Sequence, residues 1–203
     1  TSIAPLLRNG NLVILESTVP VGATEKMARV LAEMRPDLRI GQHSHGDSVP
    51  VYVAHCPERV LPGRILHELV ENDRIVGGID QDSTRRGVEF YRSFVSGNVQ
   101  GTDSRTAEMI KLTENSFRDV NIAFANELSL ICEELDLDVW EVIALANRHP
   151  RVNILRPGAG VGGHCIAVDP WFLVDSAPQT TRLIRAAREV NDSKPEKIVA
   201  HTL

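Results

Sequence analysis

The chain has 203 residues, of which 42% are hydrophobic and 24% charged, a composition typical of one large globular domain or two small ones. Its net charge of −5, without a basic run, excludes an electrostatic footprint for nucleic acid, and no apolar stretch is long enough to span a membrane. Three cysteines cannot form a disulfide framework in a chain of this length, which favours a reducing compartment and leaves a thiol free for chemistry.

The first half of the sequence alternates strand-like and helix-like segments. Strands are predicted at 12–17, 49–55 and 74–79, and helical spacing is found at 24–34, 65–70 and 82–94. This alternation predicts an α/β fold with a doubly wound parallel sheet. Ligands of such sheets bind beyond the carboxyl ends of the strands, where Thr18 and Glu58 fall.

The polar segment 39–47 contains His43 and His45. Two histidines in such a segment favour a solvated loop over a metal site. No metal is therefore expected.

After Gly97 no strand is evident, and the second half is predicted to be all helical. Asp103 or Ser104 is expected to cap a long helix that ends near Glu134. The apolar residues of this helix cover more than one face, so we expect it to be largely buried; they are Ile110, Phe117, Val120, Ile122, Phe124, Leu128 and Ile131. Asp138 and Glu141 form a capping box for a second helix through 147, and two more helices are predicted at 170–174 and 181–190.

A glycine-rich segment at 158–163 leads directly to Cys165, with Asp169 four residues further on. Four glycines in six residues disfavour regular structure and allow close approach to the backbone. Main-chain N–H groups beside a nucleophile suit a reaction in which a carbonyl oxygen gains charge. The alternative is an ordinary glycine loop with a buried structural cysteine.

Two further sets of polar residues are candidates for chemistry. Glu108, Lys111 and Asn115 share one face of the long helix, either as an exposed Glu–Lys pair or as groups that hold a substrate oxygen. Glu58 follows a proline at a strand end and is either a loop carboxylate or a general base toward water.

Four motifs occur in order along the chain: ESTVPVG at 16–22, CPERVLPG at 56–63, EMIKLTEN at 108–115 and GAGVGGHCIAVD at 158–169. Together they resemble the UDP-glucose/GDP-mannose dehydrogenase family, and the resemblance covers essentially the whole chain. It implies a partial NAD-binding Rossmann domain at 1–98 and a helical central domain at 99–203. The family's dinucleotide fingerprint is then expected before Thr1 and its C-terminal domain after Leu203, which implies truncation at both ends.

The resemblance implies a four-electron oxidation of a sugar C6 alcohol to a carboxylate through a thioester on Cys165, with NAD as cofactor. It implies that Lys111 and Asn115 stabilise oxygen charge, Asp169 supports Lys111, and Glu58 activates the hydrolytic water with help from Thr18. Substrate-binding residues by the same resemblance are Arg59, Val60, Arg151, Asn153, Gly160 and Gly162. Cofactor-binding residues are Ser17, Thr18 and Gly163. Cys56 and Cys132 match no nucleophile position and are expected to be structural.

Departures from the family pattern narrow the expected substrate. Many UDP-glucose dehydrogenases have a lysine at the position of Val168 and a glutamate at the position of Pro62. Both differences favour the branch that oxidises UDP-N-acetyl-D-mannosamine, while UDP-N-acetylglucosamine 6-dehydrogenases, an alternative, tend to have proline at Ala167. The sequence is also compatible with a non-catalytic dimerisation fragment and with a 6-phosphogluconate-type or hydroxyacid dehydrogenase, although the latter needs no Cys165.

The partners implied are a UDP-sugar and a second copy of the chain, bound through the long helix near 104–134. Neither nucleic acid nor a membrane is expected as a partner. A cytoplasmic location is expected from NAD use and from the lack of a visible signal peptide.

Overall fold

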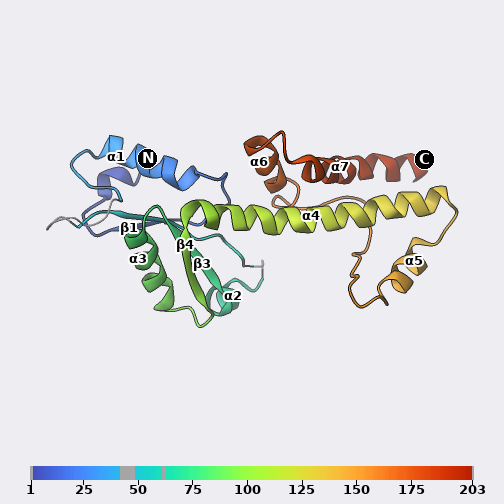
Figure 1. The fold of residues 1–203 in the computed structure, drawn as a ribbon, viewed down its shortest axis with the longest axis horizontal. Coiled ribbons are helices and arrows are strands. Elements are labelled where there is room, and N and C mark those ends of the chain that lie inside the picture. Colours follow the sequence, from blue (N-terminus) through green and yellow to red (C-terminus); the bar gives the residue numbers. More distant parts are fainter. Residues whose placement is uncertain (1, 42–48, 61–62, 203) are drawn as a thin grey trace. The chain divides into compact units, whose positions relative to one another are not determined.

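The computed structural model of the chain describes residues 2–41, 49–60 and 63–202 (Figure 1). The chain divides into two compact units, an α/β unit at 1–111 and a helical unit at 112–203. The mixed α/β fold class predicted from the sequence is confirmed.

The α/β unit contains a four-stranded sheet in the order β1-β2-β3-β4. The strands are β1 (Leu12–Leu15), β2 (Tyr52–His55), β3 (Arg74–Gly78) and β4 (Val99–Asp103). β1 pairs with β2 and β3 with β4 in parallel, whereas β2 and β3 are antiparallel, so the predicted parallel sheet is only mostly parallel.

Strand β4 corrects the expectation that no strand follows residue 97. Its register with β3 runs from Arg74 opposite Val99 to Gly78 opposite Asp103. Only Val99 is buried among its five residues. The segment therefore has no apolar alternation for the sequence to show, and backbone pairing with β3 makes it a strand.

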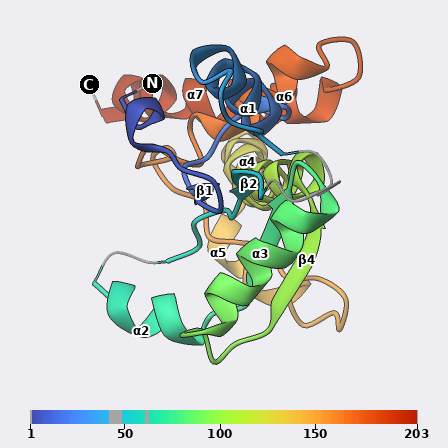
Figure 2. The ribbon, with the colours of Figure 1, turned by 90° about the vertical axis from the view of Figure 1, so that its left-hand side faces the viewer.

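Helices cover both faces of this sheet (Figure 2). The covering helices are α1 (Ala23–Met34) and α3 (Gln81–Arg92), and the unit also contains α2 (Ile65–Glu71) and the short 3-10 helix η1 (Ala4–Leu6). Alternate residues of a strand point to opposite faces, and Val13 accordingly packs in a cluster with Leu31 of α1 whereas Ile14 packs in a cluster with Tyr91 of α3.

The helical unit is built on the long helix α4 (Ser104–Glu134), inside which the boundary between the units falls. It also contains α5 (Val139–Ala146), α6 (Asp169–Ser176) and α7 (Arg182–Thr202). The expected caps are confirmed, because Asp103 accepts the Thr106 N–H at 2.9 Å and Asp138 accepts the Trp140 N–H at 2.9 Å. α7 continues well past the predicted end at 190 and lies beside α4 (Figure 1).

The expectation that the apolar residues of α4 are buried is wrong for the chain by itself. None of the seven is buried, and Phe117, Phe124 and Ile131 are 69%, 55% and 47% exposed. The buried positions of α4 are mostly small or polar and include Asn115, Asp119, Ala123 and Asn126; the large apolar exception is Leu112, which is 0% exposed. Small side chains allow close approach, and the polar ones are buried because they are hydrogen-bonded.

Within the described residues, no helix is long and apolar enough to cross a membrane.

Candidate active site

The carboxyl edge of the sheet carries the first group of predicted site residues. β1 and β2 are parallel, so the segments that follow them leave the same edge. The two segments are joined where the Glu58 N–H donates to the Glu16 carbonyl at 3.3 Å. Ser17 is exposed there, while Thr18 and Glu58 are half-buried. The α/β unit therefore brings Thr18 and Glu58 to one edge, as the sequence predicted.

The Glu58 carboxylate is oriented by its own loop. Its Oε1 accepts the Arg59 N–H at 2.6 Å and the Val60 N–H at 2.8 Å. The Arg74 guanidinium, 1% exposed, lies 3.8 Å from the same oxygen. Arg59 and Val60, predicted to bind substrate, thus serve at least to hold Glu58 through their main chain. Arg74 is not among the residues predicted from the sequence, because its position at the start of a strand does not indicate that its side chain lies beside Glu58.

The phenol of Tyr91 is buried and bonded to Glu16, which lies at this edge of the sheet. The Tyr91 hydroxyl donates to Glu16 Oε1 at 2.5 Å, and burial raises the pKa of Tyr91 well above its ordinary value. Burial also raises the pKa of the Cys56 thiol, which is 0% exposed. A buried thiol that resists ionisation is a poor nucleophile, so the structure supports the structural role predicted for Cys56.

Glu108 is not part of an exposed Glu–Lys pair, so that alternative is wrong. Its carboxylate is 1% exposed and accepts the Gly22 N–H at 2.5 Å, the Thr24 N–H at 2.7 Å and the Thr24 hydroxyl at 2.6 Å. Gly22 has φ +94°, a conformation that favours glycine. Glu108 therefore satisfies the free N–H groups at the start of α1, and Lys111 lies half-buried one turn further along α4.

The helical unit carries the second group, which consists of Asn115, Cys165 and Asp169. The Asn115 side chain donates its amide N–H to Asp169 Oδ2 at 2.5 Å, and both residues are buried. The Cys165 carbonyl accepts the Val168 N–H at 3.1 Å and the Asp169 N–H at 2.8 Å. The backbone of Cys165 is thereby fixed to the first turn of α6, beside the carboxylate that orients Asn115.

The Cys165 side chain is exposed, whereas Cys56 and Cys132 are buried. The turn before it depends on Gly163, whose φ of +83° is strained for any other residue. The alternative of a buried structural cysteine at 165 is therefore wrong. An accessible thiol at the end of an open glycine loop is suited to attack on a substrate carbonyl.

The remaining predicted substrate-binding residues lie before or within the glycine loop. Arg151 and Asn153 are exposed, and the Arg151 N–H donates to His149 Nδ1 at 3.3 Å. A side chain at Gly160 would meet the Pro195 ring at 3.1 Å, while Gly162 has open space around it. Nothing in these contacts assigns a ligand to these residues.

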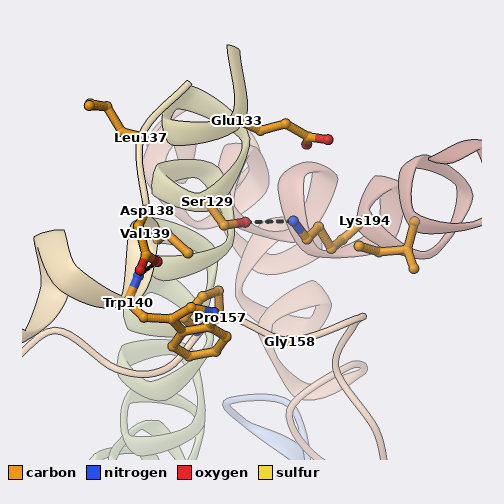
Figure 3. Close-up of a pocket in the computed structure, with 10 residues that line it drawn as sticks. Ser129, Glu133, Leu137, Asp138, Val139, Trp140, Pro157, Gly158 and Lys194 are labelled. Atoms are coloured by element: carbon orange, nitrogen blue, oxygen red, sulfur yellow. Dashed lines mark hydrogen bonds between the residues drawn. The ribbon is translucent and has the colours of Figure 1, made fainter. Parts of the chain in front are cut away.

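A cavity of about 490 Å³ lies in the helical unit beside the start of the glycine loop (Figure 3). It is lined by Ser129, Glu133, Leu137, Asp138, Val139, Trp140, Pro157, Gly158, Lys194 and Ile198. Of the described residues that line it, none is a predicted site residue. Lys194 donates to the Ser129 hydroxyl at 2.6 Å, and burial lowers the pKa of its ammonium.

No cluster of three or more potential metal ligands is found in residues 2–41, 49–60 and 63–202. The predictions on His43, His45 and Pro62 lie outside the described residues.

Comparison with family models matches residues 1–95 to the NAD-binding domain of the UDP-glucose/GDP-mannose dehydrogenase family. Residues 105–193 match the central domain of the same family. The chain belongs to this dehydrogenase family. The two matched ranges leave residues 96–104 between them, an interval that contains β4 and the start of α4. The domain boundary predicted from the sequence at 98/99 falls in this interval and stays a prediction.

Relatives with high identity include dehydrogenases of N-acetylated sugar nucleotides. The chain is 66% identical to UDP-N-acetyl-D-mannosamine dehydrogenase from Escherichia coli K12, over 96% of this chain and 46% of the relative. It is 62% identical to an NDP-N-acetyl-D-galactosaminuronic acid dehydrogenase from Ralstonia nicotianae, over 98% and 47% respectively. The structure of UDP-D-ManNAc dehydrogenase from Pyrococcus horikoshii aligns with a TM-score of 0.88 at 47% identity, over 98% of this chain and 46% of that one. The chain thus spans about half the length of the curated relatives it matches.

Family membership allows the residues of the α/β unit to be tested against NAD. The carboxyl edge offers an exposed Ser17 and a half-buried Thr18, whose hydroxyls fit the hydroxyl-rich part of a dinucleotide at the expected edge. Gly158, Gly160 and Gly163 have the spacing G-x-G-x-x-G, but they follow no strand and lie in the helical unit. They do not have the strand-turn-helix setting of a dinucleotide fingerprint.

Proposed function

We propose that the protein containing this chain oxidises the C6 alcohol of UDP-N-acetyl-D-mannosamine to the carboxylate, with NAD as cofactor. The observation that carries the proposal is the exposed Cys165, held at the first turn of α6 beside the Asn115–Asp169 pair. The 66% identity to a UDP-N-acetyl-D-mannosamine dehydrogenase supports the choice of substrate.

The proposed chemistry has two oxidations and one hydrolysis. Loss of a proton and a hydride converts the alcohol to an aldehyde, and the Cys165 thiolate adds to the aldehyde carbon. Loss of a second hydride leaves a thioester, which water cleaves to the carboxylate and the free thiol. When bound, NAD would supply the hydride acceptor, and two NAD molecules in succession would be needed, one for each hydride.

Lys111 and Asn115 are proposed to stabilise the negative charge that develops on the substrate oxygen. The Asp169 contact supports this role for Asn115, because it restricts the amide to one orientation. Glu58 is proposed to activate the hydrolytic water with help from Thr18, and the two N–H groups on its Oε1 support a fixed carboxylate there.

The remaining roles follow the family resemblance. Arg59, Val60, Arg151, Asn153, Gly160 and Gly162 are proposed to contact substrate, and Ser17, Thr18 and Gly163 the cofactor. A cytoplasmic location stays a prediction.

A homodimer through α4 is also part of this proposal. Phe117, Phe124 and Ile131 recur every seven residues and so lie on one face of the helix, and all three are exposed. A contiguous exposed apolar stripe of this kind is typical of an interaction surface. A second copy of the same helix would cover it.

The test is product stoichiometry with a panel of sugar nucleotides in the complete protein. Two NADH are expected per UDP-N-acetyl-D-mannosamine, with little turnover of UDP-glucose. Preference for UDP-glucose would contradict the substrate assignment. Preference for an N-acetylgalactosamine nucleotide would favour a second candidate function, oxidation of that sugar nucleotide, which rests on the 62% identical relative. Preference for UDP-N-acetylglucosamine would favour a UDP-N-acetylglucosamine 6-dehydrogenase.

The thioester step is tested by Cys165→Ser, with Cys132→Ser as the matched control from the same unit. Cys165→Ser is expected to abolish acid formation without unfolding the protein, because the side chain is exposed. Wild-type acid yield from Cys165→Ser would exclude the thioester mechanism.

A further inference from the structure

A network of four buried polar residues joins α4 to α7 in the helical unit. Asp119 and Asn126 of α4 are 0% exposed, and Arg188 and Asn191 of α7 are 1% exposed. Burial of four such side chains in a small unit is unfavourable unless each is hydrogen-bonded. None of the four was predicted as a site residue.

The four side chains are bonded to one another in series. Arg188 Nη1 donates to Asp119 Oδ1 at 2.5 Å, and Asn191 Nδ2 donates to the same oxygen at 2.8 Å. Asn126 Nδ2 then donates to Asn191 Oδ1 at 2.9 Å. Burial raises the pKa of Asp119, which the bonds from Asn191 and Arg188 oppose.

Two bonds of this network leave the helices and reach the main chain of the glycine loop. The Gly158 N–H donates to Asn126 Oδ1 at 2.9 Å, at the start of the loop. Arg188 Nη1 donates to the Ile166 carbonyl at 3.4 Å, one residue after Cys165. The network therefore holds both ends of the segment that presents the thiol.

After Gly160, which lies against the Pro195 ring, that segment has little packing of its own. A Cβ built at Gly162 or Gly163 would meet no atom within 4 Å, and Cys165 is exposed. A loop without packed side chains keeps its conformation only if its ends are fixed, because glycine otherwise samples many conformations. The bonds at Gly158 and Ile166 supply that restraint.

We propose that Asp119, Asn126, Arg188 and Asn191 are positioning residues that hold both ends of the 158–166 loop and so place Cys165 for attack. This inference rests on the proposed function only for the role of Cys165. The hydrogen bonds to the loop do not depend on the proposed function. A small displacement of a nucleophile lowers turnover steeply, so the expected effect is on kcat and not on KM.

The test uses the complete protein with Asn126→Leu, which keeps the number and branching of the side-chain heavy atoms but removes both side-chain bonds. Arg188→Lys is the second variant, since it keeps a positive charge opposite Asp119 but has a shorter side chain, which is expected to break the longer bond to the Ile166 carbonyl. Ser129→Ala is the matched control. The Ser129 hydroxyl accepts from Lys194 (Figure 3) and donates to the Asn126 carbonyl in the same helix pair, but it does not bond to the loop. Hydrogen–deuterium exchange of the loop peptide and steady-state kinetics are measured for each.

Both variants are expected to speed exchange at Gly158 and through the loop, and to lower kcat by about tenfold to a hundredfold with little change in KM. Ser129→Ala is expected to change neither. Unchanged loop exchange in both variants overturns the proposal whatever the activity. Faster exchange with unchanged kcat also overturns it, while leaving the proposed function intact if Cys165→Ser is inactive. Full activity of Cys165→Ser overturns both.

Discussion

The α/β unit and the helical unit differ in what they bury at their central contacts. In the α/β unit, apolar residues of β1, β2 and β3 pack in two clusters, with Tyr91 on one side of the sheet and Leu31 on the other. In the helical unit, the hydrogen bonds between α4 and α7 are made by buried charged and amide groups, and Leu112 is the one large apolar residue of α4 in this unit that is buried. Apolar patterning therefore predicts the buried faces of the sheet but not the buried face of α4.

The physical difference lies in what each buried face packs against. A sheet presents a broad apolar surface whose backbone groups are already paired, so an amphipathic helix buries its apolar side on it. α4 instead packs on a second helix and on an irregular loop with unpaired main-chain groups. Those groups need hydrogen-bonding partners, and Asn126 and Arg188 supply them.

The largest expected loss of stability follows from removing the positive charge of Arg188 from the polar contact between α4 and α7. Arg188→Met should destabilise the helical unit by about 3–5 kcal/mol, because the Asp119 carboxylate is left buried and unpaired. Both tryptophans of the chain, Trp140 and Trp171, lie in this unit, so their fluorescence during urea unfolding reports on it. The exposed Arg182→Met is the control, and equal losses from both would contradict the assignment.

An apolar truncation is the matching test in the α/β unit. Leu31→Ala should cost about 2–5 kcal/mol, since Leu31 is 2% exposed in the cluster beneath α1. Leu6→Ala, at a residue 77% exposed, should cost little. Urea unfolding followed through tyrosine, which occurs only at Tyr52 and Tyr91, reports on this unit. A small effect of Leu31→Ala would mean that the sheet faces contribute less than their burial implies.

The outward apolar stripe of α4 gives the third test. Phe124→Ser should weaken self-association, because burying a Phe side chain contributes about 1.5–3 kcal/mol. It should leave the fold of a single chain unchanged, since Phe124 is 55% exposed. Sedimentation equilibrium of the complete protein measures the first effect and circular dichroism the second. Leu66→Ser, at an exposed leucine of α2, is the control, and an equal effect from both would exclude the stripe as the interface.

The smallest expected effect is a pH dependence in the α/β unit. Burial lowers the pKa of His55 below its ordinary value, with Glu108 opposing the shift. As pH falls below about 6.5 the unfolded chain takes up the proton before the folded chain does, so stability falls, by at most about 1.4 kcal/mol per pH unit. Above that pH His55 is neutral in both states and contributes no slope.

His55→Leu should flatten this slope, measured as the urea midpoint between pH 7.5 and 5.5. His67→Asn, at an exposed histidine paired with Glu71, is the control for the other histidines. An unchanged slope in His55→Leu would mean that the pKa of His55 does not differ between the folded and the unfolded state.

Much of the architecture was predictable because the signals are local. The apolar run at 12–15, the cap at Asp103 and the cap at Asp138 each depend on a few neighbouring residues, and each is found in the structure. The predicted placement of Thr18 and Glu58 at one edge also holds, since it follows from strand direction alone. The motif around Cys165 led to the correct family for the same reason.

A further signal was present in the sequence but was not used. Glu108, Asn115, Asp119 and Asn126 recur at intervals of seven, four and seven residues, which places them on one face of α4. A polar stripe of this length on a helix marks either a solvated face or a hydrogen-bonded interior, and the sequence alone does not distinguish the two.

The sequence by itself determined the alternation of strands and helices, the family, and the exposed or capping positions set by near neighbours. Only the tertiary structure decided that β4 is a strand, that Glu108 secures the start of α1, and that the polar face of α4 is the buried one. Each of these depends on a pairing or hydrogen-bonding partner distant in the chain, between 25 and 86 residues away for Val99, Gly158 and Glu108. Such a partner replaces water for a polar group, and no local pattern records its position.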